Sequence, residues 1–161
     1  MQSVEKWSMT IHRLFSKDPN DEEENVTQNI YVFRFILFCI IVYSFEMLLN
    51  SVDIFIVDKT IFTRGYVTGC LFAAVYVLIL LHLGLEHPLT KYVSITAVSL
   101  IIMAASVSLT YHMIIIIMMP IIIAGMYTSK QLSIYTFVFT VLSIIISTYA
   151  GYYYGVCDAN M

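Results

Sequence analysis

Long uninterrupted apolar runs dominate this chain of 161 residues. Hydrophobic residues make up 60% of the sequence and charged residues only 12%, whereas about 25% of the residues in a soluble domain are charged. Runs of about 20 apolar residues match the length that a helix needs to cross a hydrocarbon core of roughly 30 Å. Backbone amides in lipid must bond within their own segment, so such runs fold as helices. The sequence therefore predicts an all-α, polytopic transmembrane helix bundle.

Five spans are expected within residues 29–161. They run from about 30–49, 66–85, 92–109, 112–126 and 132–153. Only Thr110 and Tyr111 separate the third span from the fourth. One helix of about 35 residues would far exceed the bilayer thickness, so two helices joined by a tight turn are expected there.

The polar N-terminal segment, residues 1–28, divides into an amphipathic part and an acidic connector. Trp7, Ile11, Leu14 and Phe15 are spaced i, i+4, i+7 and i+8, which puts them on one helix face. With basic residues on both sides, this pattern is typical of a short helix lying in the membrane interface. A polar tail that orders only in part is the alternative. The connector contains the acidic run Asp21, Glu22, Glu23 and Glu24.

The basic residues of the short connections predict the orientation, because lysine and arginine accumulate on the cytoplasmic side. Five lie on the side of the N-terminus: Lys6, Arg13, Lys17, Lys91 and Lys130. Two lie on the opposite side: Lys59 and Arg64. Arg34 can also reach the N-terminal side by extending its long side chain. We therefore expect a cytoplasmic N-terminus in a multi-pass membrane protein.

A few polar residues at span ends are candidates for contact with a ligand outside the cytoplasm. Glu46, Asn50 and Asp53 share one helix face at the outer end of the first span, and Tyr111 and His112 occupy an outer turn. Ionisable groups within a membrane are costly and often functional. Ordinary hydrated helix ends are the alternative, and the sequence does not identify a ligand.

Two features of the last spans concern movement and packing. Pro120 lies in the middle of the fourth span and should kink it, because proline lacks an amide hydrogen. The kink is either a hinge or a static bend. The last span has small residues at every fourth position, a spacing that lets helix backbones approach closely: Ser143, Ser147, Gly151 and Gly155. This stripe predicts close packing, either between two copies of the chain or within one bundle.

Residue patterns that carry chemistry are missing from the sequence. No nucleophile–base pair, paired carboxylates or phosphate-binding glycine loop is present, so we predict no catalytic residue in this chain. The cysteines Cys39, Cys70 and Cys157 are far apart and form no metal motif. The absence of a basic patch argues against a nucleic-acid partner. No cofactor is expected, and the lipid bilayer is the predicted partner.

The C-terminal third carries a distinctive set of residues. They are Tyr111-His112, Pro120, Tyr127, Tyr135-Thr136, Gly151-Tyr152 and the closing GVCDANM. This set resembles the N-terminal membrane region of GGDEF-type diguanylate cyclases from clostridia-like bacteria, in which a multi-helix input region precedes a cytoplasmic cyclase domain. The resemblance implies a sensory and anchoring region in a bacterial plasma membrane that dimerises as part of the full-length protein. The GGDEF domain itself is missing here, so a fragment of a longer protein is expected.

Three alternatives to this function stay open. The same kind of input region can precede a histidine kinase. A small transporter or channel would show charges facing a pathway or discontinuous helices. A non-catalytic subunit of a membrane complex would need a fixed partner.

Overall fold

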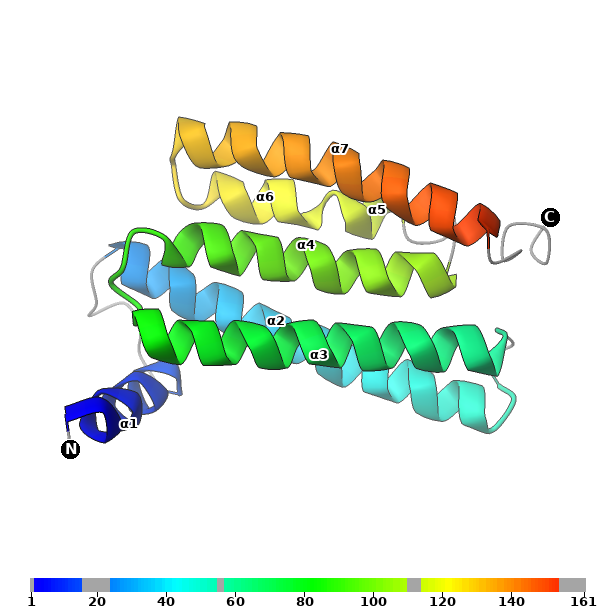
Figure 1. Ribbon diagram of the computed structural model, residues 1–161, viewed down its shortest axis with the longest axis horizontal. Helices are drawn as coiled ribbons and strands as arrows, with labels where there is room; N and C mark the ends of the chain where they lie inside the picture. Colours follow the sequence, from blue (N-terminus) through cyan, green and yellow to red (C-terminus); the bar gives the residue numbers. More distant parts are fainter. Residues whose placement is uncertain (1, 16–23, 55–56, 110–113, 154–161) are drawn as a thin grey trace.

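The computed structural model describes residues 2–15, 24–54, 57–109 and 114–153, and its elements in this part of the chain are all α-helices. In order these are α1 (Gln2–Leu14), α2 (Glu24–Ser51), α3 (Lys59–Leu83), α4 (Thr90–Leu109), α5 (Ile114–Ile117), α6 (Met119–Gly125) and α7 (Lys130–Tyr153) (Figure 1). Four of them, α2, α3, α4 and α7, are long and apolar enough to cross a membrane. The predicted all-α class is confirmed, and a multi-span membrane protein is supported.

The long helices α2, α3, α4 and α7 run up and down beside one another (Figure 1). One end of the bundle gathers α1, the start of α2, the α3–α4 turn and the α6–α7 turn. We call it the α1 end. The opposite end, which we call the far end, holds the α2–α3 connection and the C-terminal end of α7. The basic residues Arg13, Lys91 and Lys130 therefore lie at one end, as the sequence predicts.

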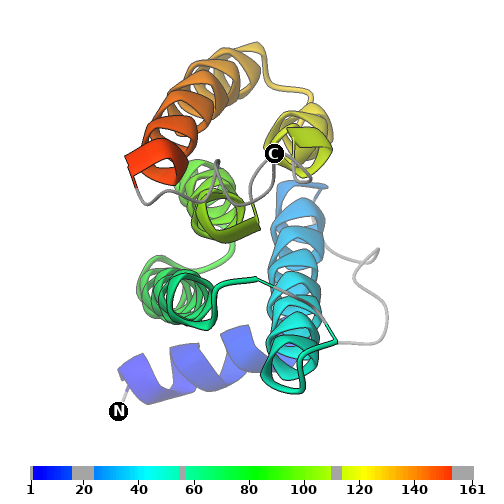
Figure 2. The ribbon, with the colours of Figure 1, turned by 90° about the vertical axis from the view of Figure 1, so that its right-hand side faces the viewer.

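Helix α4 is the central element. In the most apolar 18-residue stretch of α4, 61% of the residues are buried. The corresponding stretches of the other three long helices are 17–28% buried. Figure 2 shows α4 between α3 and α7, with α2 alongside. Ile95, Val98, Ile101 and Ile102 of α4 contribute to the main core. A helix that is apolar on all sides suits this central place.

The expected fourth span, residues 112–126, is not one helix. Helix α5 stops at Ile117 and α6 starts at Met119, with Met118 between them. Pro120 has no amide hydrogen to donate to the carbonyl of Ile116, and its ring crowds that carbonyl. Ile121 bonds instead to the Met118 carbonyl at 3.0 Å. The five continuous spans of the sequence analysis thus become four long helices and one interrupted segment.

Two spans begin earlier than the sequence suggests. Helix α3 begins at Lys59, not near residue 66, because the Asp58 carboxylate accepts hydrogen bonds from the amides of Thr60 and Ile61, both at 2.9 Å. A side-chain cap of this kind satisfies amides that have no partner in the first turn. Helix α2 begins at Glu24, so part of the acidic connector is helical.

Large apolar side chains cover the outward surface of the long helices. Phe38, Phe45, Leu78, Phe137 and Ile145 are each about 60% exposed. A contiguous apolar surface of this kind is rare on a soluble monomer, whereas a lipid environment accommodates it. The surface supports contact between the bilayer and the long helices.

Candidate functional site

Helix α1 lies across the end of the bundle. In Figure 2, which looks along the long axis of the molecule, α1 appears lengthwise while α3 and α4 are seen nearly end-on. The predicted apolar face is divided: Leu14 is 2% exposed, while Trp7 and Ile11 are about half exposed and Phe15 is 66% exposed. Leu14 therefore anchors this face of α1 in the core, and the other three side chains present an apolar surface.

Three contacts join the C-terminal end of α1 to the bundle. The Arg34 side chain of α2 donates its Nε hydrogen to the Leu14 carbonyl at 3.2 Å. Arg13 Nη1 lies 2.9 Å from Glu86 Oε1 in the α3–α4 turn. The rings of Phe15 and Phe33 meet edge to face, with centroids 5.9 Å apart. A cation at a helix C-terminus is favourable because the last carbonyls carry partial negative charge.

Buried amide side chains of α2 join two turns of the bundle. Asn29 is 2% exposed; its Nδ2 donates to the Leu85 carbonyl at 2.8 Å, and its Oδ1 accepts from the Tyr127 hydroxyl at 2.8 Å. Gln28 Nε2 donates to the Met126 carbonyl at 2.6 Å. Burial raises the pKa of Tyr127, so its hydroxyl keeps the proton that it donates. The α3–α4 and α6–α7 turns are thus held to α2.

Sequence reasoning missed this network. Gln28 and Asn29 precede the first apolar run and look like part of a hydrated lead-in. Nothing in the local pattern shows that a turn from 98 residues away packs over Asn29. A small polar cavity of about 120 Å³ lies beside the network. Its lining residues are Asn25, Asn29, Leu85, Glu86, His87, Pro88 and Lys91.

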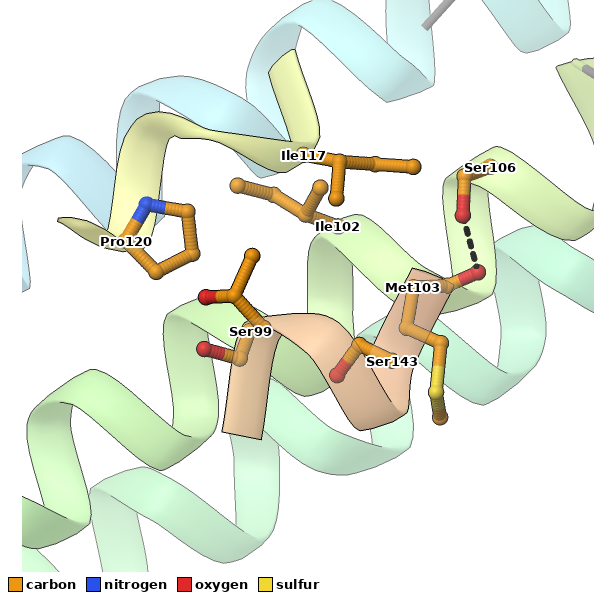
Figure 3. A pocket seen from close by; sticks show the side chains of 8 residues that line it. Ser99, Ile102, Met103, Ser106, Ile117, Pro120 and Ser143 are labelled. Atoms are coloured by element: carbon orange, nitrogen blue, oxygen red, sulfur yellow. Dashed lines mark hydrogen bonds between the residues drawn. The ribbon is translucent and has the colours of Figure 1, made fainter. Parts of the chain in front are cut away.

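A seam of hydroxyl side chains lies where α4 and α7 pack against the interrupted segment (Figure 3). Ser99 and Ser106 of α4 face Ser143 of α7, with Ile117 and Pro120 on the third side. The space between these side chains is too narrow for a water molecule. Ser106 bonds to the Met103 carbonyl at 2.9 Å.

Two hydroxyls in this seam have no hydrogen-bond partner. They belong to Ser99 and Thr140, which are 3% and 1% exposed. A buried donor without an acceptor loses about 1–3 kcal/mol relative to its hydrated state. Thr140 lies one turn before Ser143 and also lines the seam. The seam is therefore a polar, imperfectly satisfied contact at the point where the helix is interrupted.

The small-residue stripe of the last span faces inward. Ser143, Ser147 and Gly151 are buried, and α7 packs against α4 and α6. Gly155 lies outside the described residues. In the described part of α7, the stripe therefore serves packing within the bundle, which leaves the opposite, apolar face of α7 outward.

Three residues of the predicted outer polar face lie in the described part of the chain, and their surroundings differ. Asn50 is buried and donates to the Val57 carbonyl at 3.0 Å, so it holds the α2–α3 connection in place. Asp53 is exposed and pairs with Lys59 at 2.7 Å, and Glu46 is half-buried. The remaining candidates of this face, Tyr111 and His112, lie outside the described residues.

Aromatic packing closes the far end. Tyr43 meets Phe62 and Tyr66 edge to face, and its hydroxyl lies 2.9 Å from Ser108 Oγ. A Cβ atom on Gly65 would stand 2.7 Å from the Tyr43 hydroxyl and 2.9 Å from Ser108 Oγ. Gly65 therefore permits the close approach of α3 to α2 and α4.

Comparisons with known proteins give no family: no family model, curated protein or solved structure matches this chain. Among the described residues, no cluster of three His, Cys, Asp or Glu side chains could hold a metal ion.

Proposed function

We propose that this chain is the sensory and anchoring membrane region of a bacterial signalling protein. The observation that carries the proposal is the interrupted α5–α6 segment beside a seam with two unpartnered hydroxyls. Because Pro120 has no amide hydrogen for the Ile116 carbonyl, the helix is interrupted at the same contact in which the two hydroxyls lack partners.

A contact of this kind favours two arrangements of similar energy. Pairing one buried hydroxyl regains about 1–3 kcal/mol, which is the size of difference that an external stimulus can offset in a two-state equilibrium. Movement of α5–α6 against α4 and α7 is therefore the proposed response, with Pro120 as the hinge.

The contacts of α1 provide a route by which such a movement leaves the membrane. The Met126 carbonyl and Tyr127, directly after α6, bond to Gln28 and Asn29 of α2. Helix α2 in turn holds α1 through Arg34. If the basic α1 end faces the cytoplasm, a shift of α6 would move α2 through the first set of hydrogen bonds. Helix α2 would then move α1, at the cytoplasmic surface, through the second.

The proposed output follows from the resemblance to GGDEF-type input regions. A diguanylate cyclase domain is the first candidate, and a histidine kinase is the alternative. Dimerisation of the full-length protein would use outward apolar faces, such as that of Phe137, Val141 and Ile145 on α7, since the small-residue stripe is buried.

Distance measurements between spin labels test the hinge. Ile116 and Leu142 are exposed positions on α5 and α7 and would carry labels in a background with Cys39, Cys70 and Cys157 changed to alanine. In nanodiscs we expect two populated distances, which Pro120→Ala reduces to one. A pair at Ile41 and Val67, on α2 and α3 at exposed positions, should give one distance in both proteins. A single unchanged distance at both pairs would exclude the proposal.

A small transporter is a second candidate, favoured by the same interruption. Discontinuous helices with freed carbonyls form substrate and ion sites near the middle of many transporters. The residues that line the seam, however, include no ionisable side chain. Proteoliposomes that contain the chain can be tested for uptake of sodium ions or protons. Uptake that is abolished by Pro120→Ala would favour transport over sensing.

A further inference from the structure

We propose that a groove between α3, α4 and α7 binds one anionic phospholipid of the surrounding bilayer, with an acyl chain in the groove and the phosphate at Lys91 and Lys130. This site is separate from the hinge and does not depend on the proposed sensory function.

The groove is an apolar hollow on the outer side of the bundle, with a volume of about 270 Å³. Side chains from the three helices line it, among them Phe72, Val75, Ile79, Val93 and Leu100. Pockets for whole small molecules begin at about 300 Å³. A hollow of this size and apolarity, open to the bilayer, suits a length of hydrocarbon chain whose remainder stays among other lipids.

Two tyrosines mark the end of the groove that lies toward the α1 end. The rings of Tyr92 and Tyr135 meet edge to face with centroids 5.4 Å apart. The Tyr135 hydroxyl lies 2.7 Å from Thr96 Oγ1. Tyrosine is enriched at the level of lipid headgroups, where its ring is in hydrocarbon and its hydroxyl near water. The groove therefore runs from hydrocarbon depth to headgroup level.

Two lysines stand at this headgroup level. Lys91 Nζ lies 5.7 Å from the centroid of the Tyr92 ring, and Lys130 is the first residue of α7, which begins at the same end of the bundle as α4. Glu86, an acidic residue in the α3–α4 turn before Lys91, is paired with Arg13. Among the described residues, the mouth of the groove therefore carries an excess of positive charge. This charge selects an anionic headgroup over a zwitterionic one.

Native mass spectrometry of the detergent-purified chain tests the headgroup. The attraction of each lysine to an anionic lipid raises the affinity by about fivefold. With two lysines, we expect phosphatidylglycerol to bind roughly 30-fold more tightly than phosphatidylcholine. Changing both lysines to glutamine should abolish this preference, so that the two lipids bind about equally. Lys59→Gln at the far end should leave the preference unchanged. Equal binding of the two lipids by the unmodified chain would overturn the proposal.

A second pair of variants tests the acyl-chain groove. Val75 lines the groove and is 44% exposed, whereas Val67 lies on the same helix, is 58% exposed and does not line it. Val75→Trp should lower phosphatidylglycerol binding by about tenfold by filling the hollow, and Val67→Trp should not. Equal effects of the two changes would overturn the groove. So would a lipid-independent dimer that Val75→Trp dissociates, because a second copy would then occupy the hollow.

Discussion

The two ends of the bundle are held by different kinds of contact. At the α1 end, side chains of α2 bond to backbone and side-chain atoms of both neighbouring turns, so that the α3–α4 and α6–α7 turns meet at Asn29. At the far end, rings pack around Tyr43 and join α2, α3 and α4. The interrupted α5–α6 segment therefore has a hydrogen-bonded anchor at one end and, between its ends, a seam with unpartnered hydroxyls.

From this difference we expect substitutions to affect the stability of the bundle differently at its two ends and in the seam. Hydrogen bonds in a dry interior are specific in direction, and leaving one partner unpaired is costly. Ring packing depends on volume, so it is sensitive to added atoms. The hydroxyls of Ser99 and Thr140 make no hydrogen bond, so we expect their removal, without added volume, to be tolerated best.

The largest effect is expected at the α1 end, from Asn29→Leu. This change leaves the Leu85 carbonyl and the Tyr127 hydroxyl without their partner, and we expect a loss of about 3 kcal/mol in the free energy of unfolding. Thermal unfolding in detergent measures it. Asn25→Leu, one turn earlier on an exposed position, is the matched control with a change of at most about 0.5 kcal/mol. Equal losses in both variants would contradict the role of Asn29.

Gly65→Ala should come next, at the far end. Its Cβ atom would collide with the Tyr43 hydroxyl and Ser108, and overpacking of this kind costs about 1–3 kcal/mol. At Gly69 the same change meets Tyr43 only at 3.6 Å, an ordinary contact. The same unfolding assay should therefore separate the two glycines. Tolerance of alanine at Gly65 would mean that α3 does not approach α2 and α4 this closely.

A smaller effect is expected from Arg34→Gln, which removes the charge at the end of α1. The favourable interaction of a cation with a helix C-terminus amounts to about 0.3–1 kcal/mol, so the bundle should stay folded while α1 loosens. Trp7 is the single tryptophan of the chain, and quenching of its fluorescence by brominated lipids reports the position of α1. Quenching should change in this variant and not in Arg64→Gln at the far end.

The smallest effect, with the opposite sign, is expected in the seam. Ser99→Ala and Thr140→Val remove hydroxyls that have no partner, so stability should be unchanged or rise by up to about 1 kcal/mol. Thr136→Val is the control, because its hydroxyl donates to the Leu132 carbonyl at 2.7 Å. A loss of stability in Ser99→Ala or Thr140→Val larger than that in Thr136→Val would show that the seam hydroxyls have partners in the membrane.

Helix class and the presence of α1 follow from local patterns that sequence analysis reads well. Apolar length predicts α2, α3, α4 and α7, and the spacing from Trp7 to Phe15 predicts an amphipathic α1. The position of the interruption is harder to predict from the sequence. Pro120 indicates a bend but does not show at which residue the helical hydrogen bonds resume. The stripe from Ser143 to Gly151 predicts close packing without saying against what.

Apolar length alone predicts the helices α2, α3, α4 and α7, which are long enough to cross a membrane, because apolar segments can satisfy their backbone amides in lipid only by coiling. Tertiary structure alone decided which polar side chains are buried and what they bond. Asn29 became the centre of a network because turns far apart in the chain converge on it. Ser99 and Thr140 are without partners where α4 and α7 pack against the interrupted helix, in a space too narrow for water. Such roles depend on distances between segments that no local pattern encodes.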